Sequence, residues 1–357
     1  MSKKNLTPIV SCGFLALAAF AYIGFTYSKQ NKDISTRSLE AQERLDDFVQ
    51  DQITTQDTEP KELAFEDNSI LKSGEVLVVN RVPGDDYGKA AIRKTDGSRE
   101  ILDIRCLRLH ATNQALICLN NPRISSNVAA LYNISGDETS IINSWATLSP
   151  SRARISNDNK HASTTVFASG SSYEDVGEFK TFVEMIDVEN SDERKRLSEY
   201  TYDEADAKKF SNLDGNFWGV TFAPDNAFYA TFGLGNDVEI IKGSLSEESI
   251  ESTKFVGSCP SVSPDGKTLV FKERVGDKFQ LVAVNLVTDE KTVLNESRSV
   301  DDQVEWLDNE TILYSIHKDE EVEEVQPEFD IWSLKINNSS SPELFLPNAD
   351  SPSSTFS

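Results

Sequence analysis

The sequence has few of the residues on which enzyme and metal chemistry often depend. Its 357 residues include three histidines and four cysteines. It contains no HExxH or CxxC motif, and none of the histidines has another at the spacing of metal ligands. A GxSxG nucleophile elbow and an EF-hand loop are also missing. The sequence therefore predicts no catalytic residue, no cofactor and no metal site, and it favours a protein that is not an enzyme.

Basic residues are outnumbered. The 35 Lys and Arg residues face 59 Asp and Glu residues, which gives a formal net charge of −24. Binding to nucleic acid needs clustered Lys and Arg, so nucleic acid is not expected as a partner. A cation or a basic protein surface remains possible, although solubility alone also explains the charge. Gly and Pro are modest in number, which excludes a collagen-like chain, and 38% apolar residues allow a substantial core.

One long uncharged run lies near the N-terminus, at residues 8–27. At about 1.5 Å per residue, a helix of this length spans a hydrocarbon core of roughly 30 Å. We expect an uncleaved transmembrane anchor there, with a cytoplasmic tip at 1–7 and an acidic stalk or linker at 28–61. A signal peptide cleaved near Ala19-Phe20-Ala21 is the alternative.

Internal repeats follow the linker. Each repeat has an alternating apolar strand, a turn with an aspartate and a second alternating strand. The turn residues Asp225, Asp265 and Asp308 are 40 and 43 residues apart. Weaker copies begin at Arg108 and Arg154. The three clearest copies are VTFAPDNAFYATF from Val220, PSVSPDGKTLVFKE from Pro260 and VEWLDNETILYSI from Val304.

Turn chemistry explains the motif. Pro264 presets a φ near −65°, Asp265 can bond to its own backbone, and Gly266 supplies a positive φ without steric cost. Four short strands in each period of about 40 residues are typical of a β-propeller. We expect an all-β, six-bladed propeller of four-stranded blades over 62–347, with a flexible tail at 348–357; an array of β-sandwiches is the alternative. The six predicted units are 62–102, 103–144, 145–214 with an insertion after Tyr200, 215–256, 257–297 and 298–347.

The repeat resembles that of the TolB-like propeller family, in which a Ser-Pro-Asp-Gly turn is followed by Lys or Arg. Ser263–Lys267 carries this pattern, and the flanking segments 216–225, 297–308 and 344–352 resemble a subgroup of bacterial, membrane-anchored or exported TolB-like proteins. The resemblance implies a single-pass protein of the bacterial cytoplasmic membrane with its propeller on the extracytoplasmic side. We expect an envelope protein or peptide as the partner. We expect a monomer.

Two cysteines bear on the compartment. Cys106 and Cys118 lie at equal distances from Thr112, which is the predicted turn of a hairpin. Opposite neighbours in an antiparallel hairpin come close enough for a disulfide. We predict this bond, which suits an oxidising location outside the cytoplasm; two buried free thiols are the alternative. Cys259 is expected to be a buried small residue near the channel.

The loops that enter the inner strands of a propeller gather around the central channel on one face, so their polar and aromatic residues are candidates for binding. We expect a protein or peptide to bind there, and a small molecule, glycan or cation bound by an enzyme or sensor is the alternative. Structural roles are the alternative, with Trp218 packing between blades, Asp301 or Asp302 tying blades together and Lys272 pairing with a carboxylate. His110 and His161 are expected in surface turns. The candidate residues are Asn216, Trp218, Arg298, Asp301, Asp302 and Gln303.

Overall fold

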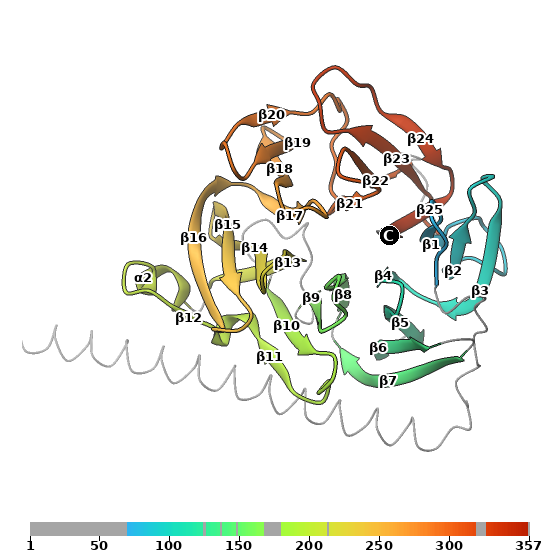
Figure 1. Ribbon diagram of the computed structural model, residues 1–357, viewed down its shortest axis with the longest axis horizontal. Helices are drawn as coiled ribbons and strands as arrows, with labels where there is room; N and C mark the ends of the chain where they lie inside the picture. Colours follow the sequence, from blue (N-terminus) through green and yellow to red (C-terminus); the bar gives the residue numbers. More distant parts are fainter. Residues whose placement is uncertain are drawn as a thin grey trace, which may run out of the picture. The chain divides into compact units, whose positions relative to one another are not determined.

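The computed structural model describes residues 70–123, 126–135, 138–147, 149–167, 180–212, 214–318 and 326–355. These residues form six sheets that are arranged as a ring around a central channel (Figure 1). The predicted all-β, six-bladed propeller is therefore confirmed. Within this described part of the chain, no helix is long and apolar enough to cross a membrane. The expected anchor at 8–27 and the linker at 28–61 lie outside the described residues.

Each blade has four antiparallel strands, and the first of them lines the channel. Blade 1 consists of β25 (Ala349–Ser354), β1 (Val76–Asn80), β2 (Lys89–Arg93) and β3 (Arg99–Arg105). Blade 2 consists of β4 (Arg108–Ala111), β5 (Ala115–Arg123), β6 (Ser126–Ser135) and β7 (Glu138–Thr147). Blade 3 consists of β8 (Ser149–Ile155), β9 (His161–Phe167), β10 (Thr181–Asp187) and β11 (Arg194–Arg196).

The other three blades follow the same order. Blade 4 contains β13 (Asn216–Phe222), β14 (Ala227–Leu234), β15 (Asp237–Ser244) and β16 (Ser249–Val256). Blade 5 contains β17 (Ser258–Val262), β18 (Thr268–Val275), β19 (Lys278–Asn285) and β20 (Lys291–Val293). Blade 6 contains β21 (Glu305–Trp306), β22 (Thr311–His317), β23 (Phe329–Lys335) and β24 (Glu343–Leu346).

In blades 3 and 5, the turn between the first two strands is built from side-chain hydrogen bonds. In blade 5, the carboxylate of Asp265 accepts from Ser263 Oγ at 2.7 Å and from the N–H of Lys267 at 3.1 Å. Blade 3 repeats the arrangement, because Asp158 accepts from Ser156 Oγ at 2.6 Å. Gly266 has the positive φ of 71° that the turn requires. Asp158 and Asp265 therefore occupy the same structural position in blades 3 and 5.

The ring is closed by the C-terminal segment, so the prediction of a flexible tail at 348–357 is wrong for 349–354. Strand β25 pairs with β1 and supplies the inner strand of blade 1. Ser351 Oγ accepts from the N–H of Leu109 at 3.1 Å, and Ser353 Oγ accepts from the N–H of Ala111 at 2.8 Å. This polar segment has little intrinsic preference for a strand. Its partners in β1 and β4 hold it in place.

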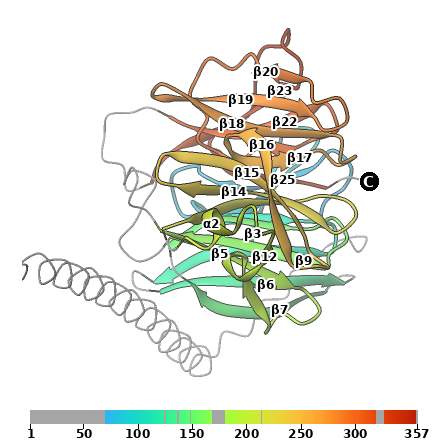
Figure 2. The same ribbon diagram turned by 90° about the vertical axis from the view of Figure 1, so that its left-hand side faces the viewer.

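The predicted insertion after Tyr200 does not extend blade 3. Its strand β12 (Thr201–Tyr202) pairs in parallel with β16, which gives blade 4 a fifth strand. The short helix α2 (Ala207–Phe210) follows and lies at the outer edge of blade 4 (Figures 1 and 2). Phe210 anchors it, since its ring meets that of Phe232 edge-on at 4.9 Å. The insertion covers a strand edge that would otherwise offer unpaired backbone groups.

The predicted disulfide between Cys106 and Cys118 is confirmed. The predicted hairpin register is wrong, because Leu109, and not Cys106, lies opposite Cys118. Cys106 precedes β4 in the link from blade 1, where its N–H donates to the carbonyl of Gly88 at 2.8 Å. The bond thus joins the link between two blades to the second strand of blade 2.

Candidate functional site

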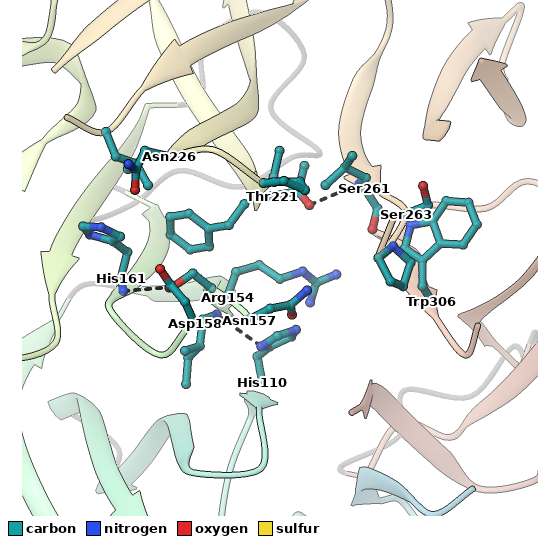
Figure 3. Close-up of a pocket in the computed structure, with 18 of the residues that line it drawn as sticks. His110, Arg154, Asn157, Asp158, His161, Thr221, Asn226, Ser261, Ser263 and Trp306 are labelled. Carbon is teal, nitrogen blue, oxygen red and sulfur yellow. Dashed lines mark hydrogen bonds between the residues drawn. The ribbon is translucent and has the colours of Figure 1, made fainter. Parts of the chain in front are cut away.

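A cavity of about 380 Å³ opens at the end of the channel where the aspartate turns lie (Figure 3). We call it the mouth cavity. The turns of blades 3, 4 and 5 form much of its wall, through residues 155–158, 221–226 and 261–264. His110 from blade 2 and Glu305 and Trp306 from blade 6 complete it. A volume of this size lies within the range of about 300–1,000 Å³ that is typical of ligand sites.

Three charged or polar side chains meet at the base of the mouth cavity. Arg154 extends toward the centre, with His110 on one side and Trp306 on another (Figure 3). Its Nη2 donates to the carbonyl of Val304 at 3.1 Å and lies 3.6 Å from Glu305 Oε2. His110 Nε2 lies 3.5 Å from the same carboxylate oxygen. These contacts join blades 2, 3 and 6 across the channel.

The hydrogen bonds determine the charge of this cluster. His110 Nδ1 accepts from the N–H of Ile155 at 3.1 Å, which requires an unprotonated Nδ1. Burial lowers the pKa of His110 as well, so the imidazole is neutral. Burial alone would raise the pKa of Glu305, but His110, Arg154 and the N–H of Ser354 outweigh it and lower that pKa. The cluster thus holds one cation and one anion.

Aromatic and hydroxyl groups line the rest of the mouth cavity. His161 stacks with Phe222, with their ring centroids 6.4 Å apart. Trp306 is 3% exposed, and its Nε1 has no hydrogen-bond partner among the described residues. Ser263 Oγ is already bound to the turn carboxylate. The described residues of the cavity therefore offer donors, acceptors and apolar surface for binding, without a serine held by a general base.

Five wall and base residues occupy the same position of the repeat. In each blade, this residue lies on the inner strand, two positions before the first residue of the turn. The strand registers and the turn hydrogen bonds establish this position. A search of the aligned repeats for polar residues at this position would have found them, whereas motif searches did not. The five are His110, Arg154, Thr221, Ser261 and Glu305.

The expectation that His110 is a surface turn residue is wrong. It is 7% exposed and lies on β4, ahead of the turn at Thr112. The weak register of its repeat placed it too close to the turn. His161 does lie beside a turn and is partly exposed.

Two of the residues predicted to bind a ligand make buried hydrogen bonds inside the ring instead. Asp302 is buried, and its carboxylate accepts from the N–H of Ser315 at 3.0 Å and from that of Gln303 at 2.9 Å. Gln303 Nε2 donates to the carbonyls of Val220 at 3.0 Å and Pro260 at 2.7 Å. Gln303 therefore ties blade 6 to blades 4 and 5.

The remaining predicted residues also make structural contacts. Asn216 Oδ1 accepts from the N–H of Thr181 at 3.1 Å, which links blades 3 and 4. Trp218 is buried against Gly233 of its own blade, where a Cβ would come within 2.7 Å of the indole. Neither residue lines the mouth cavity.

Arg298 and Asp301 lie in the link that leads into blade 6. Arg298 pairs with Glu296 and covers the ring of Trp332, 3.8 Å from its centroid. Asp301 forms an ion pair with Lys272, the pairing that the sequence left open. The candidate residues are thus spread over several contacts, and the mouth cavity at the turn end was not among the expected sites.

The described residues form a six-bladed propeller around a channel, and several solved structures are similar to it in fold. TolB from Acinetobacter baumannii is similar with a TM-score of 0.57 and 18% sequence identity, over 79% of this chain and 66% of that chain. A chain of the Nidogen/Laminin complex is similar with a TM-score of 0.50 and 10% identity, over 78% of this chain and 97% of that chain. A putative TolB from Agrobacterium tumefaciens has a TM-score of 0.49 and 11% identity, over 78% and 90%.

The match spans slightly less than two thirds of the length of the A. baumannii TolB. No protein-family model matches the sequence, and no curated protein matches it significantly. At these identities the similarity shows the fold alone.

Proposed function

We propose that this protein is a membrane-tethered, extracytoplasmic propeller that binds a protein or peptide of the cell envelope at the mouth cavity. The mouth cavity carries the proposal: residues of five blades converge there on an opening with apolar, hydroxyl and charged groups. Peptide side chains are recognised by this mixture of surfaces. The disulfide supports an oxidising compartment. The uncharged run at 8–27 supports the tether.

The similar structures add support from the fold. TolB and a chain of the Nidogen/Laminin complex share this propeller, and the latter was solved in a complex of two proteins. A ring of rigid blades with exposed turns is suited to present such a surface.

Site-specific photocrosslinking in native membranes tests the binding site. A photoreactive side chain is placed at Asn226, an exposed residue of the mouth cavity, and at Val287, which is 76% exposed and does not line the cavity. We expect one partner to be cross-linked from Asn226 and not from Val287, with identification by mass spectrometry. The same set of proteins from both positions would contradict the proposal.

The tether is tested separately by alkaline extraction of membranes. We expect the full-length chain to stay in the membrane fraction, and a chain that lacks residues 1–27 to be released. A shortened wild-type protein in the soluble fraction would show cleavage instead.

A small molecule or glycan is the second candidate for the mouth cavity. The buried Nε1 of Trp306 favours it, because a buried donor without a partner among the described residues is expected to gain one from a ligand or water. A thermal-shift screen of sugars and metabolites tests this. A saturable shift that is lost in the variant His161→Ala would support the small ligand over the protein partner.

A further inference from the structure

Hydrogen bonds of one kind join neighbouring blades at the mouth end of the channel. A side chain near the end of one inner strand accepts from a backbone N–H on the inner strand of the next blade, and we call this contact the inter-blade bond. Among the described residues it is present at four of the six junctions. The pairs of acceptor and donor are Ser353 Oγ with Ala111 at 2.8 Å, His110 Nδ1 with Ile155 at 3.1 Å, Thr221 Oγ1 with Val262 at 3.2 Å and Glu305 Oε1 with Ser354 at 3.2 Å.

The four acceptors respond differently to acid. The hydroxyl groups of Ser353 and Thr221 do not titrate in mild acid. The pKa of Glu305 is lowered despite its burial, by His110 and Arg154, so its carboxylate also stays ionised there. The imidazole of His110 can gain a proton on Nδ1, and a protonated Nδ1 donates but no longer accepts. The inter-blade bond between His110 and Ile155 is therefore the one of the four that mild acid can break.

The charges around His110 keep its proton out while the bond is closed. Its Nε2 lies 3.5 Å from Glu305 Oε2 of blade 6, which attracts a proton, and Arg154 of blade 3 opposes one. Asp350 of the neighbouring β25 is already bound by two arginines. Burial outweighs the attraction of Glu305 and lowers the pKa of His110. Protonation is therefore favoured only when the bond to Ile155 opens.

The junction that this bond closes is also a wall of the mouth cavity. Residues 155–158 form the part of the wall that blade 3 contributes, and His110 lines the cavity from blade 2. Farther out, Asn159 Nδ2 donates to Gln114 Oε1 at 3.3 Å, but this contact is exposed. Ile155 and His110 are both buried, so two donors that face each other there have no solvent to separate them. Protonation of His110 should therefore move the wall away from blade 2.

We propose that the bond between His110 and Ile155 is an acid-sensitive closure of the junction between blades 2 and 3, which opens the wall of the mouth cavity in mild acid and weakens binding there. The effect on binding rests on the proposed function, whereas the opening of the junction does not. The equivalent junction between blades 4 and 5, with a hydroxyl as acceptor, stays closed under the same conditions.

Hydrogen–deuterium exchange of the full chain tests the opening. Ile155 and Val262 form a matched pair, because their N–H groups make the same inter-blade bond to an imidazole and to a hydroxyl. Exchange is followed from pH 7.5 to pH 5 by mass spectrometry with residue-level fragmentation, and each rate is divided by the intrinsic rate at that pH. We expect the protection of Ile155 to fall by up to about tenfold per pH unit below about pH 6.5, and that of Val262 to fall much less. An equal loss at both amides would show unfolding of the ring as a whole and would overturn the proposal.

The variant His110→Gln connects the effect with the imidazole. The side-chain amide of Gln can accept from Ile155 and does not titrate, so the protection of Ile155 should depend little on pH. If this variant does not fold, His110→Thr takes its place, because Thr221 is the acceptor of the equivalent bond. His317→Gln, at an exposed position, should keep the pH dependence of the wild type. A dependence that persists without His110 would assign it to another group and overturn the proposal.

The effect on binding is measured by cross-linking from a photoreactive side chain at Asn226 in native membranes, at pH 7.5 and at pH 5.5. The yield at the lower pH, relative to that at the higher, should be reduced in the wild type and closer to one in His110→Gln. Equal ratios in the two proteins would overturn the coupling to binding. If no partner is cross-linked at either pH, the proposed function fails, and the exchange of Ile155 still decides whether the junction opens.

Discussion

Asp350 lies in the strand that closes the ring, and it shows how single residues hold the blades together. Burial alone would raise the pKa of Asp350, but the charges of Arg108 and Arg81 and the N–H of Ser351 lower it. His110 provides the contrasting case, since it is buried as a neutral acceptor for the N–H of Ile155. Both residues connect different blades. Their ionisation states are therefore linked to the stability of the whole ring.

Replacement of Asp350 by Asn should lower the free energy of unfolding by about 3–5 kcal/mol at pH 7, because the buried Arg81 and the partly buried Arg108 lose their carboxylate. Urea unfolding measures the change. Asp289→Asn is the control, since Asp289 pairs with Lys254 at the exposed surface and such pairs contribute about 0–1 kcal/mol. Equal losses in the two variants would contradict the assigned role.

The same pair of proteins gives a pH test. The folded pKa of Asp350 is lowered, so its stabilising effect is present above the unfolded pKa of about 3.9 and is lost as pH falls through the folded value. The difference between the wild type and Asp350→Asn should therefore shrink below about pH 4. A difference that grows on acidification would be inconsistent with this account.

His110→Gln should change how stability depends on pH. The folded pKa of His110 is lowered by burial, so its contribution is present above the unfolded pKa of about 6.5 and is lost as pH falls below it. His110 should add at most about 1.4 kcal/mol per pH unit to the stability that the wild type loses below pH 6.5, so the variant should lose less over this range. His317→Gln, at an exposed position, is the control and should follow the wild type.

Among the strands, β25 has a particular role, because it closes the ring. It joins the two ends of the described chain through β1 and is anchored to blade 2 by Ser351 and Ser353. The aspartate turns of blades 3 and 5 act locally, since Asp158 and Asp265 hold their own hairpins by side-chain bonds to nearby backbone. The insertion with β12 and α2 protects one edge of blade 4.

A chain that ends at Pro347 should fail to fold, or should lose stability comparable with that of an entire domain, about 5–15 kcal/mol. Without β25, blade 1 loses its inner strand and buried apolar residues such as Leu77 and Val79 gain solvent. Circular dichroism during heating measures the effect. A chain that ends at Thr355 keeps β25 and should match the wild type. Normal stability of the shorter chain would show that β25 does not close the ring.

The molecule as a whole combines a strongly acidic composition with a channel lined by arginines. The six blades contact one another through buried side chains and through residues that bridge neighbouring or opposite blades. The disulfide adds a covalent link where blade 1 leads into blade 2. The loss of contacts in one blade should therefore lower the stability of the entire ring and not of that blade alone.

Removal of the disulfide by the double substitution Cys106→Ser and Cys118→Ser should lower the free energy of unfolding by about 3 kcal/mol, for a loop of this length. We expect a single, shifted transition in differential scanning calorimetry, because blade 2 shares its core with blade 1. Substitution of the free Cys259 by Ala serves as the control without a covalent link. A separate early transition would show that blade 2 unfolds independently.

The sequence by itself determined the class of fold and the number of blades, because turn chemistry and the alternation of apolar residues are local and are repeated along the chain. It also predicted the pairing of Cys106 with Cys118, although from a hairpin register that the structure does not have. Only the tertiary structure decided that 349–354 is a strand, since its polar residues take their partners from β1 and β4. It also decided the site, because the base of the mouth cavity joins His110, Arg154 and Glu305 from three blades. Residues so distant in sequence become neighbours only when the ring closes.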